Sequence, residues 1–177
     1  MTKLFGFAGW SGSGKTTAIE QVIPHLRGRG LTVSLIKHAH HGFDIDQPGK
    51  DSWRHRRAGC GEVLITSSVR WALMHELRDE PELTLPQALC RLSPCDLVLI
   101  EGYKWAAIPR LEIHRPAIGK PLLFPDDPGI IGLATDAPSQ FSGARLPVLD
   151  LSNAGALCEF VIAHCTELVF DKLPPTL

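Results

Sequence analysis

Two hydrophobic patterns alternate along the chain, and each predicts a different kind of element. Short continuous apolar runs are typical of strands that are buried on both faces of a parallel sheet. Between them, apolar residues recur every three or four positions, as in helices that bury one face. We expect strands at residues 4–8, 31–36, 62–66, 69–75, 96–100, 110–114, 130–134 and 146–149, and helices at residues 15–29, 51–58, 85–92 and 153–165. This order predicts an α/β fold of three layers, with a mostly parallel central sheet and added edge strands.

Residues 110–114 (Arg-Leu-Glu-Ile-His) depart from the continuous apolar pattern, because polar and apolar side chains alternate. Such alternation predicts a strand with one exposed face. Two interpretations stay open: an edge strand protected by charge, or a ligand-binding strand to which Lys104, Arg115 and Lys120 add positive charge. We expect this strand and the one that holds Trp71 to form exposed sheet edges, where a second subunit can pair.

The composition is ordinary for a folded, water-soluble protein. The 177 residues are 44% hydrophobic and 21% charged, with a formal net charge of −1, so no overall field favours nucleic acid or a membrane. The apolar runs are too short to span a bilayer. The five cysteines include no Cys-X-X-Cys pair, which indicates reduced thiols and a cytoplasmic location. The length predicts one domain over residues 1–170, followed by a flexible tail over residues 171–177.

Residues 5–17 read Phe-Gly-Phe-Ala-Gly-Trp-Ser-Gly-Ser-Gly-Lys-Thr-Thr and contain a complete Walker A phosphate loop between the first strand and the first helix. Its glycines can turn backbone N–H groups inward, and the helix N-terminus adds partial positive charge, so the loop can bind phosphate. Lys15 should reach the β- and γ-phosphates, and the Thr16 hydroxyl should bind Mg²⁺. These features predict a P-loop NTPase. The residues expected to bind the phosphates are Gly9, Ser11, Gly12, Ser13, Gly14, Lys15, Thr16 and Thr17.

A second chemical landmark is Glu101, which directly follows the apolar run at residues 97–100. A buried parallel strand of this kind delivers a carboxylate beside the phosphate loop, where it can bind Mg²⁺ or polarise an attacking water. Lys37, at the end of the second strand, can meet a terminal phosphate, and Asp44 or Asp46 can hold Mg²⁺ directly or through water. We therefore predict catalytic roles for Lys15, Lys37 and Glu101, and a metal site made of Thr16, Asp46 and Glu101.

Two polar clusters in residues 37–58 leave alternatives open. The spacing of His38, His40 and His41 matches no standard structural zinc pattern, so we favour a nucleotide-site loop over a zinc site or a purely solvated loop. The predicted helix at residues 51–58 carries either a solvated basic face or a patch for an anionic ligand or an acidic partner. The side chains of that patch are Arg54, His55, Arg56 and Arg57.

Five sequence blocks span most of residues 3–136. They are residues 9–17, Lys37-His38 through Asp46 to residues 48–52 (Pro-Gly-Lys-Asp-Ser), Ala58-Gly59, residues 101–104 and residues 110–115. Taken together, these blocks resemble the MobB family of molybdopterin-guanine dinucleotide biosynthesis proteins, and the blocks after the Walker A loop are the more specific. Tyr103 and Cys60 stand where the family usually has phenylalanine and a small residue. The resemblance implies a GTP-binding, Mg²⁺-dependent homodimer with weak GTP hydrolysis. It also implies a partner enzyme, MobA, which attaches GMP to molybdopterin, and it leaves direct binding of molybdopterin open.

The chain also resembles dethiobiotin synthetase in layout, so a small-molecule kinase or ligase is the alternative to a nucleotide-binding adapter. A pocket for a phosphate acceptor and a fast turnover would favour the kinase. We see no glutamine or arginine placed to support fast hydrolysis, which favours a slow GTPase at most. The chain lacks the Asn-Lys-X-Asp string that many GTP-binding proteins use for guanine. Asp136, after Thr135 at the end of a predicted strand, is the substitute candidate.

Overall fold

The computed structural model describes residues 1–39, 42–103 and 106–167. Contacts divide the chain into two compact units: Met1–His38 with Leu85–Leu177, named here the sheet unit, and Ala39–Thr84, named the hairpin unit. The single nucleotide-binding domain over residues 1–170 stays a prediction. The tail expected at residues 171–177 lies outside the described residues.

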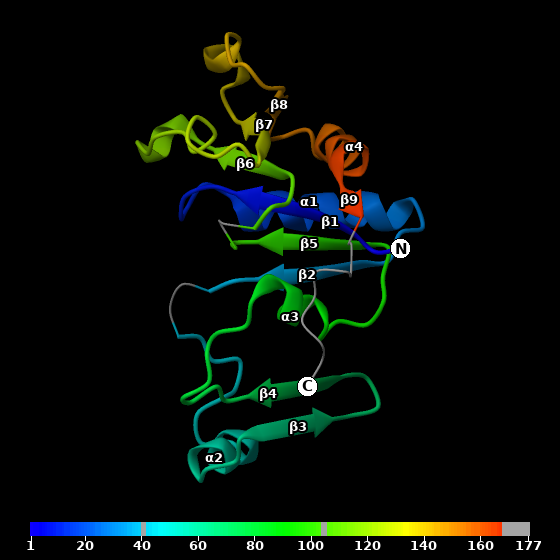
Figure 1. Cartoon of the computed structure of the whole chain (residues 1–177), viewed down its shortest axis with the longest axis vertical. Coiled ribbons are helices and arrows are strands. Elements are labelled where there is room, and N and C mark those ends of the chain that lie inside the picture. Colours follow the sequence, from blue (N-terminus) through cyan, green and yellow to red (C-terminus); the bar gives the residue numbers. More distant parts are fainter. Residues whose placement is uncertain (40–41, 104–105, 168–177) are drawn as a thin grey trace. The chain divides into compact units, whose positions relative to one another are not determined.

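The sheet unit is built on a seven-stranded sheet whose strand order is β2-β5-β1-β6-β7-β8, with β9 paired to β1. All neighbours are parallel except β9, which runs antiparallel to the start of β1. Figure 1 shows these strands stacked from β8 to β2, with β1 near the middle. The strands are β1 (Lys3–Ala8), β2 (Val33–Lys37), β5 (Leu97–Glu101), β6 (Arg110–His114), β7 (Ile130–Thr135), β8 (Val148–Asp150) and β9 (Thr166–Glu167).

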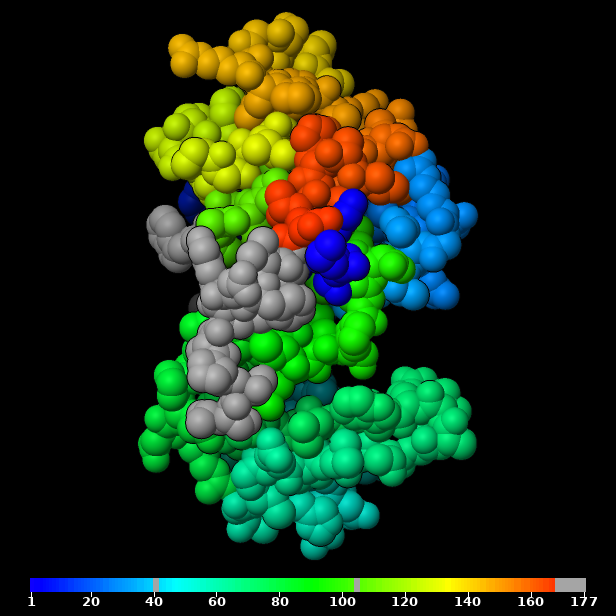
Figure 2. Space-filling model, turned by 45° about the vertical axis from the view of Figure 1, so that its right-hand side comes forward, coloured from blue at the N-terminus to red at the C-terminus, as the bar shows by residue number. Residues whose placement is uncertain are grey.

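Helices cover both faces of this sheet and complete the three-layer α/β fold that the sequence predicts. On one face, α1 (Lys15–Gly28) and α4 (Ala154–His164) pack together over β1, as apolar side chains such as Phe5, Val22 and Leu157 are fully buried there. Figure 2 shows the orange-red surface of α4 bordering the blue surface of α1. On the other face, α3 (Leu85–Leu89) buries its leucines in a second cluster with Val98 and Ile100. Burying each such side chain contributes about 1.5–3 kcal/mol.

The position of β6 contradicts the expectation of a half-exposed edge strand. All five residues of β6 are buried, because the strand lies between β1 and β7 inside the sheet. Its polar side chains are accommodated by internal partners: Arg110 pairs with Asp127 at 2.6 Å, and the Glu112 carboxylate accepts two backbone hydrogen bonds. The expected exposed face of this strand, and the pairing of a second subunit there, are therefore wrong.

β2 was expected to be buried on both faces, and this expectation is also wrong. The strand ends the sheet, with β5 beside it, and its residues are only partly covered; Leu35 is 41% exposed. A continuous apolar run therefore does not distinguish this edge strand from the interior strand β5, which is buried at every position.

The hairpin unit contains α2 (Asp51–Arg57) and a separate two-stranded antiparallel sheet of β3 (Glu62–Thr66) and β4 (Trp71–His75). We expected the strand that holds Trp71 to extend the central sheet, but it pairs with β3 instead, and β9 is the strand added to the central sheet. Leu64 lies opposite Leu73 in the hairpin, and both are exposed, as is Trp71.

Two helices differ from their expected bounds. α4 begins after Asn153, whose Oδ1 accepts a hydrogen bond from the Ala156 N–H at 3.0 Å. The helix expected at residues 85–92 ends at Leu89. Short 3-10 helices follow two strands of the sheet: η1 (Pro116–Ile118) after β6 and η2 (Pro138–Phe141) after β7.

Within the described ranges, no helix is long and apolar enough to cross a membrane.

Candidate nucleotide-binding site

The phosphate loop, residues 9–16, connects the buried strand β1 to the first turn of α1. Gly9, Gly12 and Gly14 have φ values of 140°, 81° and 95°, a region that favours glycine. At Gly9 the need for glycine is also spatial, because a Cβ there would lie 2.4 Å from the Ile113 carbonyl oxygen. The structure thus gives this loop the backbone path that the sequence motif predicts.

Lys15 and Ser13 show the polar character of the loop interior. The Lys15 ammonium donates hydrogen bonds to the carbonyl oxygens of Gly9 and Trp10, each at 2.9 Å, and so lies across the loop. The Ser13 hydroxyl is buried and has no hydrogen-bond partner among the described residues. A buried hydroxyl without a partner is uncommon in folded proteins, and it fits a loop that receives an oxygen-rich ligand.

Glu101 and Lys37 lie at the ends of neighbouring strands and contact each other. Glu101 ends β5 opposite Phe7 of β1 on one side and Lys37 of β2 on the other. The Lys37 Nζ lies 3.5 Å from Glu101 Oε2; the carboxylate side chain is 10% exposed and the lysine side chain 53%. A carboxylate and two lysines therefore gather at the carboxyl ends of β1, β2 and β5. The catalytic roles of Lys15, Lys37 and Glu101 stay predictions.

His38 supports the turn that carries Glu101. Its backbone N–H donates to the Glu101 carbonyl at 2.8 Å, and its ring lies 4.9 Å from the Tyr103 ring. Gly102, with φ at 100°, allows this approach, because a Cβ there would lie 2.6 Å from the His38 Cβ. His38 therefore has a packing role in the structure. The other two members of the histidine cluster, His40 and His41, lie outside the described residues.

Arg115 links the phosphate loop to Asp136, a contact that the sequence did not predict. Arg115 Nε donates to the Ser13 carbonyl at 3.2 Å, and Nη1 lies 3.3 Å from Asp136 Oδ2. The side chain also lies against Gly14, where a Cβ would be 3.2 Å from Nε. The position of Arg115 could have indicated this contact, because the residue directly follows β6, the strand beside β1. Asp136, the candidate for guanine recognition, is thereby tied to the phosphate loop.

A second missed contact joins Trp10 of the phosphate loop to the segment after η1. The Trp10 indole N–H donates to the Pro121 carbonyl at 2.7 Å, and the Lys120 ammonium lies 5.7 Å from the indole ring centroid. Two residues further on, the backbone N–H groups of Leu123 and Phe124 bind the buried Glu112 carboxylate at 2.8 and 2.9 Å. Burial raises the pKa of Glu112 above its ordinary value. The segment that contacts Trp10 is therefore anchored to β6.

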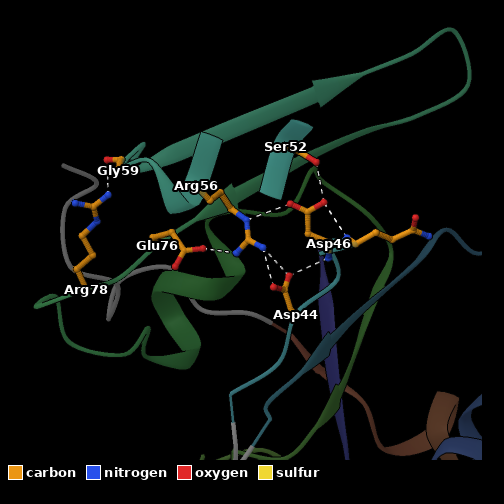
Figure 3. Close-up of polar contacts among 8 residues, drawn as sticks. Asp44, Asp46, Ser52, Arg56, Gly59, Glu76 and Arg78 are labelled. Atoms are coloured by element: carbon orange, nitrogen blue, oxygen red, sulfur yellow. Dashed lines mark hydrogen bonds and ion pairs between the residues drawn. The ribbon is translucent and has the colours of Figure 1, made fainter. Parts of the chain in front are cut away.

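Asp46, the third predicted metal ligand, belongs to the hairpin unit and has partners there. Figure 3 shows Asp44, Asp46 and Glu76 around the Arg56 guanidinium. The Asp46 carboxylate accepts a hydrogen bond from the Ser52 hydroxyl at 2.7 Å and pairs with Arg56 Nε at 3.2 Å. The bond from Arg56 lowers the pKa of Asp44, and the reverse contact raises the pKa of Arg56. The metal role of Asp46 stays a prediction.

The contacts of Arg56 show that this residue of α2 is not part of a basic patch for an anionic ligand. The Arg56 side chain is only 13% exposed and is surrounded by carboxylates, so it does not belong to a solvent-facing patch for anions. Arg57 lies over the Trp53 ring at 5.7 Å, and Arg54, 71% exposed, has Asp51 at 4.0 Å. An anionic ligand of α2 would therefore meet Arg54 and Arg57 rather than Arg56.

The loop and its neighbours fit a Mg²⁺–nucleotide complex. In the described part of the chain, no group of three His, Cys, Asp or Glu side chains is arranged to hold a metal ion by itself. Mg²⁺ in nucleotide sites does not need such a group, because it keeps waters and binds phosphates with one or two protein oxygens. Thr16 lies in the first turn of α1, and Glu101 ends the strand beside β1, so these two residues are suitable donors.

Comparisons with known proteins identify the family of this chain. Residues 4–136 match the family model for "Molybdopterin guanine dinucleotide synthesis protein B" (MobB). The chain is 41% identical to the molybdopterin-guanine dinucleotide biosynthesis adapter protein of Escherichia coli (strain K12) over 165 residues, 92% of this chain and 93% of that protein. It is 38% identical to the Haemophilus influenzae protein of the same name over 159 residues, 89% of this chain and 86% of that protein.

Solved structures give the same result at the level of the fold. A crystal structure of molybdopterin-guanine biosynthesis protein B (MobB) aligns with a TM-score of 0.71 and 26% identity, covering 90% of this chain and 98% of that chain. The crystal structure of Bacillus subtilis MobB aligns with a TM-score of 0.70 and 21% identity, covering 93% and 98%, which supports the fold alone. With its phosphate loop, its sheet and these relatives in agreement, the chain belongs to the MobB family.

Proposed function

We propose that this protein is a GTP-binding adapter in the biosynthesis of molybdopterin guanine dinucleotide, the form of the molybdenum cofactor named in its family. One observation carries the nucleotide half of the proposal. The phosphate loop, Lys37 and Glu101 come together at the carboxyl ends of β1, β2 and β5. Ligands of open α/β sheets bind at that edge. The adapter half rests on membership of the MobB family and on the relatives named as adapter proteins.

Each residue of the site has a chemical task in this proposal. The loop N–H groups and Lys15 bind the β- and γ-phosphates, with the N-terminus of α1 adding partial positive charge. Thr16 and Glu101 hold Mg²⁺, whose charge offsets that of the phosphates, and Asp46 is a further candidate ligand. Lys37, with its Nζ 3.5 Å from Glu101 Oε2, adds a second positive charge beside the terminal phosphate.

The site favours nucleotide retention over rapid hydrolysis. Glu101, opposite Phe7 of β1, is an acid that can orient a water beside the loop, and Arg115 contacts the loop backbone at Ser13. We propose slow, Mg²⁺-dependent GTP hydrolysis by a homodimer, with the guanylyl transfer to molybdopterin carried out by the partner enzyme MobA.

Nucleotide binding and partner dependence can be tested separately. Calorimetry with GTP and ATP, with and without Mg²⁺, tests the site, and light scattering tests the dimer. Formation of molybdopterin guanine dinucleotide by MobA, with and without this protein, tests the adapter role. We expect Mg²⁺-dependent GTP binding, slow hydrolysis and a higher MobA yield. A protein that rapidly phosphorylates a small acceptor without MobA would instead be a kinase of the kind that the dethiobiotin synthetase resemblance suggests.

A further inference from the structure

We propose that Asp136 and Arg115 form the base-recognition end of the nucleotide site. In this arrangement Asp136 reads the Watson–Crick edge of guanine, and Arg115 is a positioning residue that fixes Asp136 relative to the phosphate loop. The inference rests on the proposed function, because it names the residues that make the same site prefer GTP to ATP.

The sheet places these residues on the side of the loop where the base must lie. Glu101 and Lys37 occupy the β5 and β2 side of β1, so the terminal phosphate and Mg²⁺ belong there. β6 and β7 follow on the opposite side, and the register pairs His114 with Thr135, so Arg115 and Asp136 leave neighbouring strands at the same edge. The end of β7 lies two strand spacings from β1, about 10 Å, which a ribose and an α-phosphate can bridge.

The Arg115 guanidinium, a single rigid group, contacts both the phosphate loop and Asp136. Its Nε donates to the Ser13 carbonyl of the phosphate loop at 3.2 Å, while Nη1 reaches Asp136 Oδ2 at 3.3 Å. The guanidinium is planar, so its two contacts fix the direction as well as the distance between them. The absence of a side chain at Gly14 provides the space, because a Cβ there would lie 3.2 Å from Arg115 Nε.

Buried residues on either side of Asp136 fix the turn, while the Asp136 carboxylate stays accessible. Thr135 is fully buried, and its hydroxyl accepts a hydrogen bond from the Ala137 N–H at 3.3 Å. In η2, which follows the turn, the Phe141 ring meets the buried His114 ring edge-on at 5.5 Å. The Asp136 side chain is 42% exposed, and Phe141 is half-buried, which leaves aromatic surface near the turn for the face of a base.

A carboxylate at this position distinguishes guanine from adenine by hydrogen-bond chemistry. Guanine presents two donors on its Watson–Crick edge, N1–H and the N2 amino group, and an ionised carboxylate only accepts. Adenine presents N1 as an acceptor, which a carboxylate repels. Since Arg115 Nη1 contacts Oδ2 of the Asp136 carboxylate, it orients the group. This pair replaces the Asn-Lys-X-Asp string that the sequence lacks.

Calorimetry on the full chain with Mg²⁺ and three nucleotides tests the inference: GTP, ATP and xanthosine triphosphate. We expect the wild type to bind GTP at least about tenfold more tightly than ATP. Xanthine has a carbonyl oxygen where guanine has the N2 amino group, so Asp136→Asn, whose amide can donate, should lose affinity for GTP and gain affinity for xanthosine triphosphate. Arg115→Gln should lower GTP affinity by a larger factor than ATP affinity. Arg27→Gln, a matched change on the exposed side of α1, should alter neither.

Each failure has a different meaning. A wild type that binds no triphosphate would refute the proposed function itself. Equal GTP and ATP affinities, or an Asp136→Asn protein that still prefers GTP and does not gain xanthosine triphosphate, would leave nucleotide binding intact and overturn the base assignment. If Arg115→Gln weakens GTP and ATP by the same factor, Arg115 serves the phosphate loop alone. Circular dichroism spectra of the folded variants, which should match the wild type, accompany each titration.

Discussion

The Lys37 ammonium lies 3.5 Å from the Glu101 carboxylate, at the ends of two neighbouring strands in the same register. Three adjacent strands therefore contribute to this edge of the sheet: β1 leads into the phosphate loop, β5 ends in the acid Glu101, and β2 ends in the cation Lys37. Because Glu101 is nearly buried and Lys37 is half exposed, the lysine can turn toward a phosphate while the acid stays in place. In this pair, Glu101 is held in place by its surroundings, and Lys37 can change its side-chain conformation.

Glu101→Gln should keep nucleotide binding and lose Mg²⁺-dependent hydrolysis, because the amide keeps the shape of the side chain without its charge. We expect turnover to fall by about 100-fold. Loss of the ion pair with the half-exposed Lys37 should change stability by at most about 1 kcal/mol. Phosphate release measured under saturating GTP checks the prediction, with the exposed acid variant Glu20→Gln as control. Wild-type turnover in Glu101→Gln would show that the residue only ends the strand.

Lys15→Ala should weaken triphosphate binding by about 1.5–3 kcal/mol, the worth of a charge-assisted hydrogen bond in a partly buried site. The change also removes the two contacts that Lys15 makes to the loop carbonyls. Calorimetry with GTP and Mg²⁺ measures the loss. The matched control is Lys3→Ala, an exposed lysine at the start of β1, which should bind as the wild type does. Equal affinities for both variants would refute the assignment of the phosphate loop.

Local patterns predicted the parts of this fold that depend on local chemistry. The Walker A spacing predicted a glycine-rich turn before a helix, and the positive φ values at Gly9, Gly12 and Gly14 confirm it. The apolar run ending in Glu101 predicted an interior strand, which β5 is. Both predictions use information within about a dozen neighbouring residues, which hydrophobic periodicity and turn chemistry describe well.

Contacts between distant residues explain what the sequence did not predict. Polar alternation in β6 normally means an exposed face, but Arg110 finds Asp127 and Glu112 finds backbone N–H groups on a later segment. Arg115 could not be assigned because its partners, Ser13 and Asp136, meet it only through the strand order. Pairings of this kind depend on topology, which no local pattern encodes.

Glu112 should make the stability of the protein depend on pH. Burial raises the pKa of this carboxyl group in the folded state, so the folded protein holds the proton at pH values where the unfolded chain has lost it. Wild-type stability should therefore fall, relative to Glu112→Gln, as the pH rises from the ordinary glutamate value through the raised one. Each tenfold difference in proton affinity corresponds to about 1.4 kcal/mol.

Urea denaturation of both proteins between about pH 4 and pH 8 measures this difference. Only the difference between the two proteins is informative, because His114 also titrates differently in the folded state, where burial lowers its pKa. A stability difference that stays constant across the range would mean that Glu112 has the same proton affinity in the folded and unfolded chains.

Trp10 and Glu112 should act together on nucleotide binding, because they hold the same segment from opposite ends. Trp10 binds the Pro121 carbonyl, and Glu112 binds the N–H groups of Leu123 and Phe124. Trp10→Phe keeps an aromatic ring under Lys120 but removes the donor, which should lower stability by about 1 kcal/mol. Once Glu112→Gln has loosened the segment, Trp10→Phe should lower the free energy of unfolding by a smaller amount. A double-mutant cycle on unfolding free energy and GTP affinity should therefore give a coupling of at least about 0.5 kcal/mol. Strictly additive effects would show that the phosphate loop does not depend on how this segment is anchored to β6.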